Sequence, residues 1–136
     1  MGYQIGESAS VSKTISESDV YLFAGISGDF NPVHVNKVAA EKSTFGRRIA
    51  HGFLAGSLIS NAIGMTLPGP GTIYMEQDLN FLKPVYIGDT LTANVEIIEV
   101  INEFKNILRL QTVVINQKND KVICGFAVVK APKREE

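Results

Sequence analysis

The stretch HGFLAGSLISNAIGMT, residues 51–66, predicts the architecture of this chain. Its apolar side chains fall on more than one face of a helix, and small residues such as Ala55, Gly56 and Ala62 stand between them. Such a helix is expected to be buried on most sides, with the small residues allowing a sheet to approach closely. Residues 68–71, Pro-Gly-Pro-Gly, end the helix.

Downstream of this helix the pattern changes to strands, expected at 72–81, 90–100, 106–116 and 122–130. In residues 90–100, for example, Leu91, Ala93, Val95 and Ile97 fall on one face of an extended chain. The composition of residues 102–105 and 118–121 is typical of hairpin turns, and strands joined by short turns pair antiparallel. One apolar helix followed by such strands predicts an α+β domain, with the sheet wrapped around the helix.

Upstream of the helix the elements are shorter. Residues 11–15 alternate as a short strand, and Ser16 with Asp19 has the pattern of a helix start, in a helix expected to end near residues 25–28. A loop follows at 28–34 and a short helix at 37–42. We see no repeat or linker, so one domain is expected over residues 1–136.

Composition limits the possible functions. Hydrophobic residues make up 45% and charged residues 20% of the chain, and the net charge is −1, which argues against general nucleic-acid binding. No segment is long and apolar enough to span a membrane, and the first residues lack the pattern of a signal peptide. Cys124 is the only cysteine, so we expect a buried, inert thiol and a reducing cytoplasmic location.

The sequence GDFNPVH, residues 28–34, is the first candidate site. It places a carboxylate, Asp29, and an imidazole, His34, on either side of a stiff Asn31-Pro32 pair. An ionised carboxylate accepts a proton from water, and a histidine titrates near neutrality, so the two can act as an acid–base pair. The alternative interpretation is a plain turn in which Asp29 or Asn31 caps local amides. The residues alone leave both open.

Residues 50–54, Ala-His-Gly-Phe-Leu, form the second candidate site at the start of the long helix. Free amides at a helix N-terminus favour negative charge, and the N–H of Gly52 is accessible because Gly52 has no side chain. The alternative interpretation is that Gly52 only permits close packing, and His51 is interpreted as a structural residue that satisfies buried backbone groups. Two histidines and one cysteine, without metal-binding spacing, predict no metal site.

These blocks resemble the signature of the MaoC-like (R)-specific enoyl-CoA hydratases. The first block runs from Tyr21 through residues 27–34 to Ala40, the second is residues 50–52, and the third is Asn80 to Leu91. The resemblance covers about residues 5–130. It departs at Arg47-Arg48, where the family often has a proline, and this pair is interpreted as solvated surface with a possible role near CoA phosphates.

The resemblance implies a hot-dog fold, a curved antiparallel sheet around one long central helix, usually dimeric. It implies (R)-specific hydration of short trans-2-enoyl-CoA thioesters, with no cofactor beyond the acyl-CoA substrate. Asp29 and His34 are then the catalytic pair, and the Gly52 N–H polarises the thioester carbonyl. Substrate-binding positions are expected at Asn31, Ser60, Ile63 and Val128.

Three other functions fit the same signature less well. The closest is a dehydratase of acyl-carrier-protein thioesters, which runs the same chemistry in reverse. A thioesterase is common on this fold but does not need the Asp-x-Asn-Pro-x-His loop. A non-catalytic partner subunit is disfavoured because both Asp29 and His34 are present.

Two further expectations concern packing. Ser60 and Ile63 are three residues apart on the long helix and are expected to share a face that lines the acyl tunnel and limits chain length. Residues 122–129 are apolar or small on both faces, which a half-solvated sheet in a monomer does not require. We therefore expect a homodimer as the minimal unit.

Overall fold

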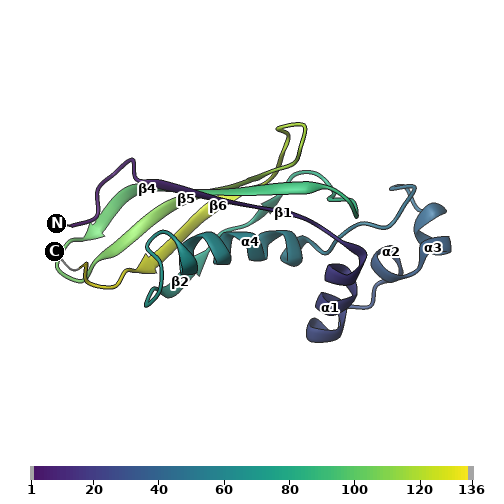
Figure 1. The fold of residues 1–136 in the computed structure, drawn as a ribbon, viewed down its shortest axis with the longest axis horizontal. Coiled ribbons are helices and arrows are strands. Elements are labelled where there is room, and N and C mark those ends of the chain that lie inside the picture. The colour runs from purple at the N-terminus through teal and green to yellow at the C-terminus, as the bar shows by residue number, and fades with distance from the viewer. Residues whose placement is uncertain (1, 135–136) are drawn as a thin grey trace.

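The computed structural model describes residues 2–134; Met1, Glu135 and Glu136 lie outside the described residues. Within this range a six-stranded antiparallel sheet curves along one long helix, α4 (Figure 1). The elements in chain order are β1 (Ser8–Thr14), α1 (Glu17–Ser27), α2 (Pro32–Val35), α3 (Lys37–Glu41), α4 (Gly52–Met65), β2 (Ile73–Gln77), β3 (Asn80–Phe81), β4 (Thr90–Asn102), β5 (Ile107–Ile115) and β6 (Lys121–Lys130). This is the α+β hot-dog architecture expected above, and that expectation is confirmed.

The strands lie in the order β1-β4-β5-β6-β2, and β3 pairs with β6 beside β2. β4, β5 and β6 are joined by hairpins at the predicted turns. β1, near the N-terminus, pairs antiparallel with β4, although the two strands are far apart in the sequence. The two outer edges are therefore formed by β1 on one side and by β2 and β3 on the other. The helices α1, α2 and α3 lie together at one end of the sheet, and the termini lie at the opposite end (Figure 1).

The core lies between the concave face of the sheet and α4. Leu91, Ala93, Val95 and Ile97 of β4 are all fully buried, as their alternation predicted. The sheet-facing side of α4 is also buried and consists of Ala55, Leu58, Ile59, Ala62 and Ile63. Each large aliphatic side chain buried in this way contributes roughly 1.5–3 kcal/mol.

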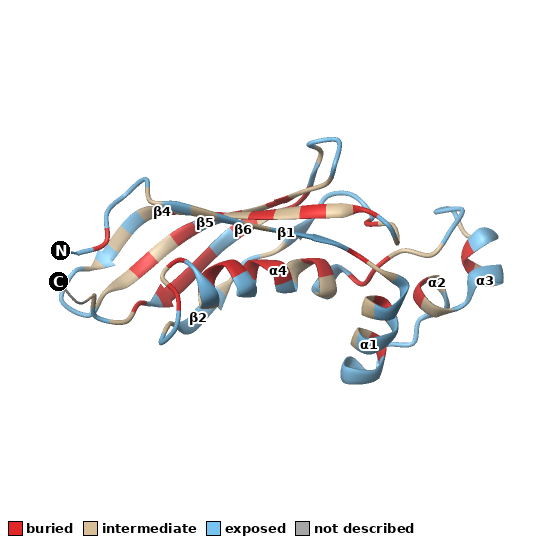
Figure 2. Cartoon of the chain, in the orientation of Figure 1, coloured by how far each residue is buried: buried red, intermediate tan, exposed pale blue. Residues whose placement is uncertain are grey.

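The expectation that α4 is buried on most sides is wrong for the single chain. Its far side is exposed (Figure 2), and Phe53 and Met65 are 67% and 69% exposed. The buried stripe covers only the side that meets the sheet, because in the described residues no second layer covers the other side. The apolar residues on that side, Phe53 and Met65, are thus left exposed.

The single strand expected at 72–81 is also wrong, because β2 and β3 are separated at Asp78 and Leu79. The Asp78 N–H donates to the carbonyl of Phe126 at 2.7 Å, and at this point the two backbones approach closely. A Cβ atom on Gly125 would lie 1.9 Å from the Asp78 carbonyl oxygen, so only glycine fits there. The close approach redirects the chain and interrupts regular pairing.

The helix signals upstream are confirmed. Ser16 caps α1 by accepting from the Asp19 N–H at 3.1 Å, and the Asp19 carboxylate accepts from the Ser16 N–H at 2.9 Å. These reciprocal bonds form a capping box. Gly28 ends the helix in the left-handed region, at φ 79°. The left-handed Gly28 therefore fixes where α1 ends, and the candidate loop begins at the next residue, Asp29.

Two smaller expectations are corrected by burial. His34 does not lie in a loop, because Pro32 starts the one-turn helix α2 and His34 is only 7% exposed. Cys124 is half-buried rather than buried, because it lies on β6 on the side away from α4. In residues 2–134 no helix is long and apolar enough to cross a membrane.

Candidate active site

Asp29 is the first residue beyond the α1 cap and is exposed to solvent. Its carboxylate accepts a hydrogen bond from the Asn31 N–H at 3.1 Å. The Asn31 side chain in turn accepts from the Val33 N–H at 3.3 Å and caps α2. Both interpretations of this loop therefore describe part of it: Asn31 caps a turn, and the turn holds the Asp29 carboxylate beside the helix that carries His34.

His34 is held by one hydrogen bond that assigns its tautomer. Its Nδ1–H donates to the backbone carbonyl of Ile49 at 2.7 Å, because a carbonyl oxygen only accepts. In the neutral ring Nε2 is then unprotonated and free to accept a proton. The strand bridge between Ile49 and Tyr86 anchors that carbonyl to the rest of the fold.

His51 joins the two residues of the pair. It is 2% exposed, and its ring stacks on the His34 ring with centroids 3.9 Å apart and planes inclined by 28°. Its Nε2–H donates to the backbone carbonyl of Asp29 at 2.9 Å. The predicted structural role of His51 is thus visible, and the backbone group that it satisfies belongs to the candidate catalytic residue.

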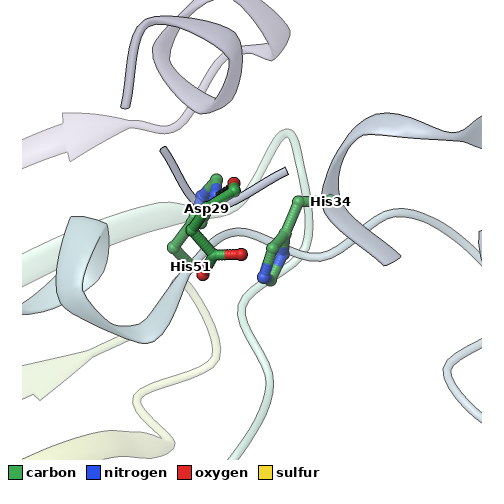
Figure 3. Close-up of side chains that lie close together, drawn as sticks. All are labelled: Asp29, His34 and His51. Carbon is green, nitrogen blue, oxygen red and sulfur yellow. Dashed lines mark hydrogen bonds between the residues drawn. The ribbon is translucent and has the colours of Figure 1, made fainter. Parts of the chain in front are cut away.

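One potential ligand atom from each of Asp29, His34 and His51 lies within 4.8 Å of the others. In Figure 3 the Asp29 carboxylate points toward the His34 ring, with His51 behind it. Such a trio has the composition of a metal site. An imidazole nitrogen binds a metal along the plane of its ring, however, and two nearly parallel stacked rings do not converge on one ion. The arrangement suits proton transfer better.

An apolar cavity of about 430 Å³ lies beside this cluster. His34 and Gly52 line it together with Ile49, Phe53, Phe81 and Val85. Gly52 is the first residue of α4, where backbone N–H groups have no acceptor within the helix. A Cβ atom at Gly52 would lie 2.7 Å from the Phe81 ring, so a larger residue there would have to displace that ring.

The structure brings together three of the seven predicted site residues. His34 and Gly52 line the cavity, and Asp29 lies close to His34 without lining it, whereas Asn31, Ser60, Ile63 and Val128 are also not among the residues that line it. Ile63 is 1% exposed in the core, and Val128 is 7% exposed on β6. The assignment of these four residues to substrate binding stays a prediction.

The expectation that Ser60 and Ile63 share one face does not hold within the chain. Ser60 is exposed while Ile63 packs against the sheet, because the edge of the buried stripe of α4 runs between them. Sequence reasoning also missed Phe81 and the Ile49 carbonyl. No local pattern marks either one, since each acts through a contact with a distant segment.

Fold and site together define a hot-dog protein with a carboxylate–imidazole pair beside an apolar cavity. The sequence matches the MaoC like domain over residues 4–119, so the chain belongs to the MaoC-like family.

Two curated relatives and one solved structure show how close the match is. The (R)-specific enoyl-CoA hydratase of Rhodospirillum rubrum is 50% identical over 95% of this chain and 88% of its own length. The 3-hydroxybutyryl-CoA dehydratase of Methylorubrum extorquens is 43% identical over 98% of this chain and 83% of its own. The solved R-hydratase PhaJ1 from Pseudomonas aeruginosa has a TM-score of 0.92 at 45% identity, covering 97% of this chain and 84% of its own.

Proposed function

We propose that this protein adds water to the double bond of trans-2-enoyl-CoA thioesters and forms (R)-3-hydroxyacyl-CoA, with short acyl chains preferred. One observation carries the proposal: the Asp29 carboxylate and the His34 ring converge beside an apolar cavity that the first turn of α4 also lines. The names of the relatives support the substrate class and the configuration. Nothing in the proposed chemistry requires a metal or a redox cofactor.

The two acceptors dictate how a water molecule is held. The Asp29 carboxylate and the free His34 Nε2 can each accept one hydrogen of the same water, which turns the water oxygen toward the substrate. As that oxygen bonds to C3, one of the two acceptors takes a proton. The proton delivered to C2 then comes from the protonated group, so no net proton is gained or lost.

The N-terminus of α4 supplies the electrophilic assistance. The Gly52 N–H at the first helical position is the donor for the thioester oxygen, on which negative charge develops as hydroxide adds to C3. The helix dipole favours the same charge. In other enzymes, removal of one such donor lowers turnover by about 10²–10³-fold. We therefore expect the Gly52 N–H to contribute to turnover to about the same extent as a residue of the acid–base pair.

The test is a two-channel assay with crotonyl-CoA. Loss of the enoyl-thioester absorbance without release of free thiol supports hydration, and chiral analysis of the product should give the R isomer. Thiol release would support the thioesterase alternative. Turnover of a crotonyl thioester of an acyl-carrier protein in clear preference to crotonyl-CoA would support the other dehydratase. The absence of any reaction with these substrates would overturn the proposal.

We also propose that the protein acts as a homodimer joined through the β2–β3 edge. That edge is apolar: Ile73, Met75 and Phe81 are between 50% and 57% exposed. The β1 edge, in contrast, consists mostly of serine, threonine and lysine, so it exposes little apolar surface, and its lysine opposes strand pairing. An apolar edge of this kind suits contact with a second copy. Action in the cytoplasm, as one domain over residues 1–136 and without nucleic-acid partners, is part of the same proposal.

A further inference from the structure

A second cavity adjoins the apolar one and has a different chemistry. Its volume is about 200 Å³, and it shares Lys83 and Pro84 with the apolar cavity, so the two are neighbours. Three cationic side chains line it: Arg47 before α4, Lys83 after β3, and Lys118 in the turn between β5 and β6. We call this feature the basic groove.

Arg47 is held in place without an acidic partner. Its guanidinium lies over the Tyr86 ring, 4.1 Å from the centroid, and the Tyr86 hydroxyl donates to the Phe45 carbonyl at 3.2 Å. Phe45 itself lines the apolar cavity. Among the described residues no carboxylate pairs with Arg47, whereas the adjacent Arg48 pairs with Glu17 at 3.0 Å. Stacking thus positions the Arg47 guanidinium and leaves its N–H donors available.

The carboxylates of the basic groove are already engaged. Asp89 is 7% exposed and accepts from the Tyr86 N–H and from the Gln117 side chain, each at 2.9 Å. Asp120 pairs with Lys83 at 3.4 Å. In the described chain no carboxylate pairs with Lys118 either. The groove therefore presents two cations, Arg47 and Lys118, that an anionic ligand can meet without first displacing a salt bridge.

We propose that the basic groove binds the phosphate groups of the nucleotide half of CoA while the thioester enters the apolar cavity. This inference rests on the proposed function, since it concerns the same substrate. A guanidinium fixed on an aromatic ring and a free ammonium suit phosphate oxygens, which form strong charge-assisted hydrogen bonds with both. Neither Arg47 nor Lys118 reaches the reacting atoms, so both are binding residues and not catalytic ones.

The experiment compares two thioesters that differ only in the groups that the groove would hold. Crotonyl-CoA carries the nucleotide and its phosphates, and crotonyl-pantetheine carries neither. For Arg47→Ala, the ratio of kcat/KM for crotonyl-CoA to that for crotonyl-pantetheine should fall about tenfold, as for the loss of one charge-assisted contact. Arg47→Ala with Lys118→Ala should lower it further. Lys105→Ala, an exposed cation in the β4–β5 turn, is the matched control and should leave the ratio unchanged.

The salt dependence and the binding of free CoA give independent readings. Binding of CoA measured by calorimetry should weaken as salt is raised, and less steeply in the double variant, because fewer charges then meet the phosphates. An unchanged ratio and an unchanged CoA affinity in the double variant would overturn the inference. Failure of the wild-type chain to hydrate either thioester would count against the proposed function. The calorimetric comparison would still decide whether the groove binds CoA.

Discussion

The hydrogen bond from His34 Nδ1–H to the Ile49 carbonyl determines what this histidine can do. It leaves Nε2 as the nitrogen that exchanges a proton and prevents the ring from turning. Asp29, in contrast, is exposed and retained mainly by its loop. The pair therefore combines one rigid, buried partner with one solvated partner.

Asp29→Asn and His34→Ala should each lower kcat by about 10²–10⁴-fold, as expected for a positioned acid or base. Their effects on folding should differ. Asp29→Asn should leave the free energy of unfolding nearly unchanged, because Asp29 is exposed, whereas His34→Ala removes a buried ring from its stack on His51. Denaturant unfolding beside steady-state kinetics separates the two effects. Full activity in either variant would remove that residue from the mechanism.

His51 should affect turnover as well as stability, although the sequence alone predicted mainly a stability effect. Its ring packs on His34 and its N–H holds the Asp29 backbone, so it positions both catalytic residues. His51→Phe keeps a stacking ring but removes the donor, and His51→Gln keeps an amide donor but removes the ring. Both should lower kcat by about tenfold or more with little change in KM.

Unfolding measurements and kinetics on these two variants identify which contact matters. His51→Phe should remain well folded, since it also removes the buried Nδ1 atom that has no hydrogen-bond partner in the described residues. A well-folded His51→Phe protein with wild-type kcat would show that the bond to Asp29 has no positioning role. Wild-type kcat in His51→Gln would show the same for the stack.

α4 serves three purposes along its length. Its first turn offers the Gly52 N–H to the cavity, its sheet-facing side builds the core, and its far side is left exposed. A residue on this helix therefore lines the cavity, builds the core or faces solvent according to its position along and around the helix. Spacing in the sequence does not reveal where the boundaries between these sides lie.

Ile63→Ala should reduce the free energy of unfolding by about 2–5 kcal/mol, the usual cost of such a truncation in a core. The side chain is 1% exposed and does not line the cavity, so the proposed preference for short acyl chains should change little. Ser60→Ala is the matched variant on the exposed side of α4 and should alter stability by less than about 0.5 kcal/mol. A shift toward longer chains in Ile63→Ala would restore the tunnel assignment made from the sequence.

At the scale of the whole molecule the sheet has a polar edge, β1, and an edge with exposed apolar side chains, β2 and β3, where Ile73, Met75 and Phe81 lie. The basic groove and the catalytic cluster lie near the loops before α4 and around Pro84, away from the termini. A second copy joined at the β2–β3 edge would cover apolar surface that a single chain leaves in water.

Light scattering at micromolar concentration should therefore give at least twice the 14.8 kDa mass of the chain. Ile73→Lys should shift the protein toward monomer, because a charge placed on an apolar edge opposes burial there. Ser10→Lys on the exposed β1 edge is the control and should leave the mass unchanged. A stable, active monomer in the wild-type protein would contradict the proposed interface.

Local patterns in the sequence were sufficient for most of the helices and strands and for finding the candidate pair. The capping box at Ser16, the alternation through Leu91 to Ile97 and the Pro-Gly run after α4 each depend on neighbouring residues, so they can be interpreted without a fold. The Asp29–His34 spacing is local in the same way. These patterns predicted the α+β domain and singled out the candidate pair, whereas the hot-dog fold and the catalytic role of the pair were implied by the resemblance to the MaoC-like hydratases.

Contacts between distant segments were decided only by the tertiary structure. The break at Asp78 requires Gly125 from another strand, and the tautomer of His34 requires the carbonyl of Ile49. The basic groove needs Arg47, Lys83 and Lys118 from three separate loops. Such contacts depend on how strands and loops far apart in the chain come together, and a residue's own neighbours in the sequence contain no signal of which distant partner it will meet.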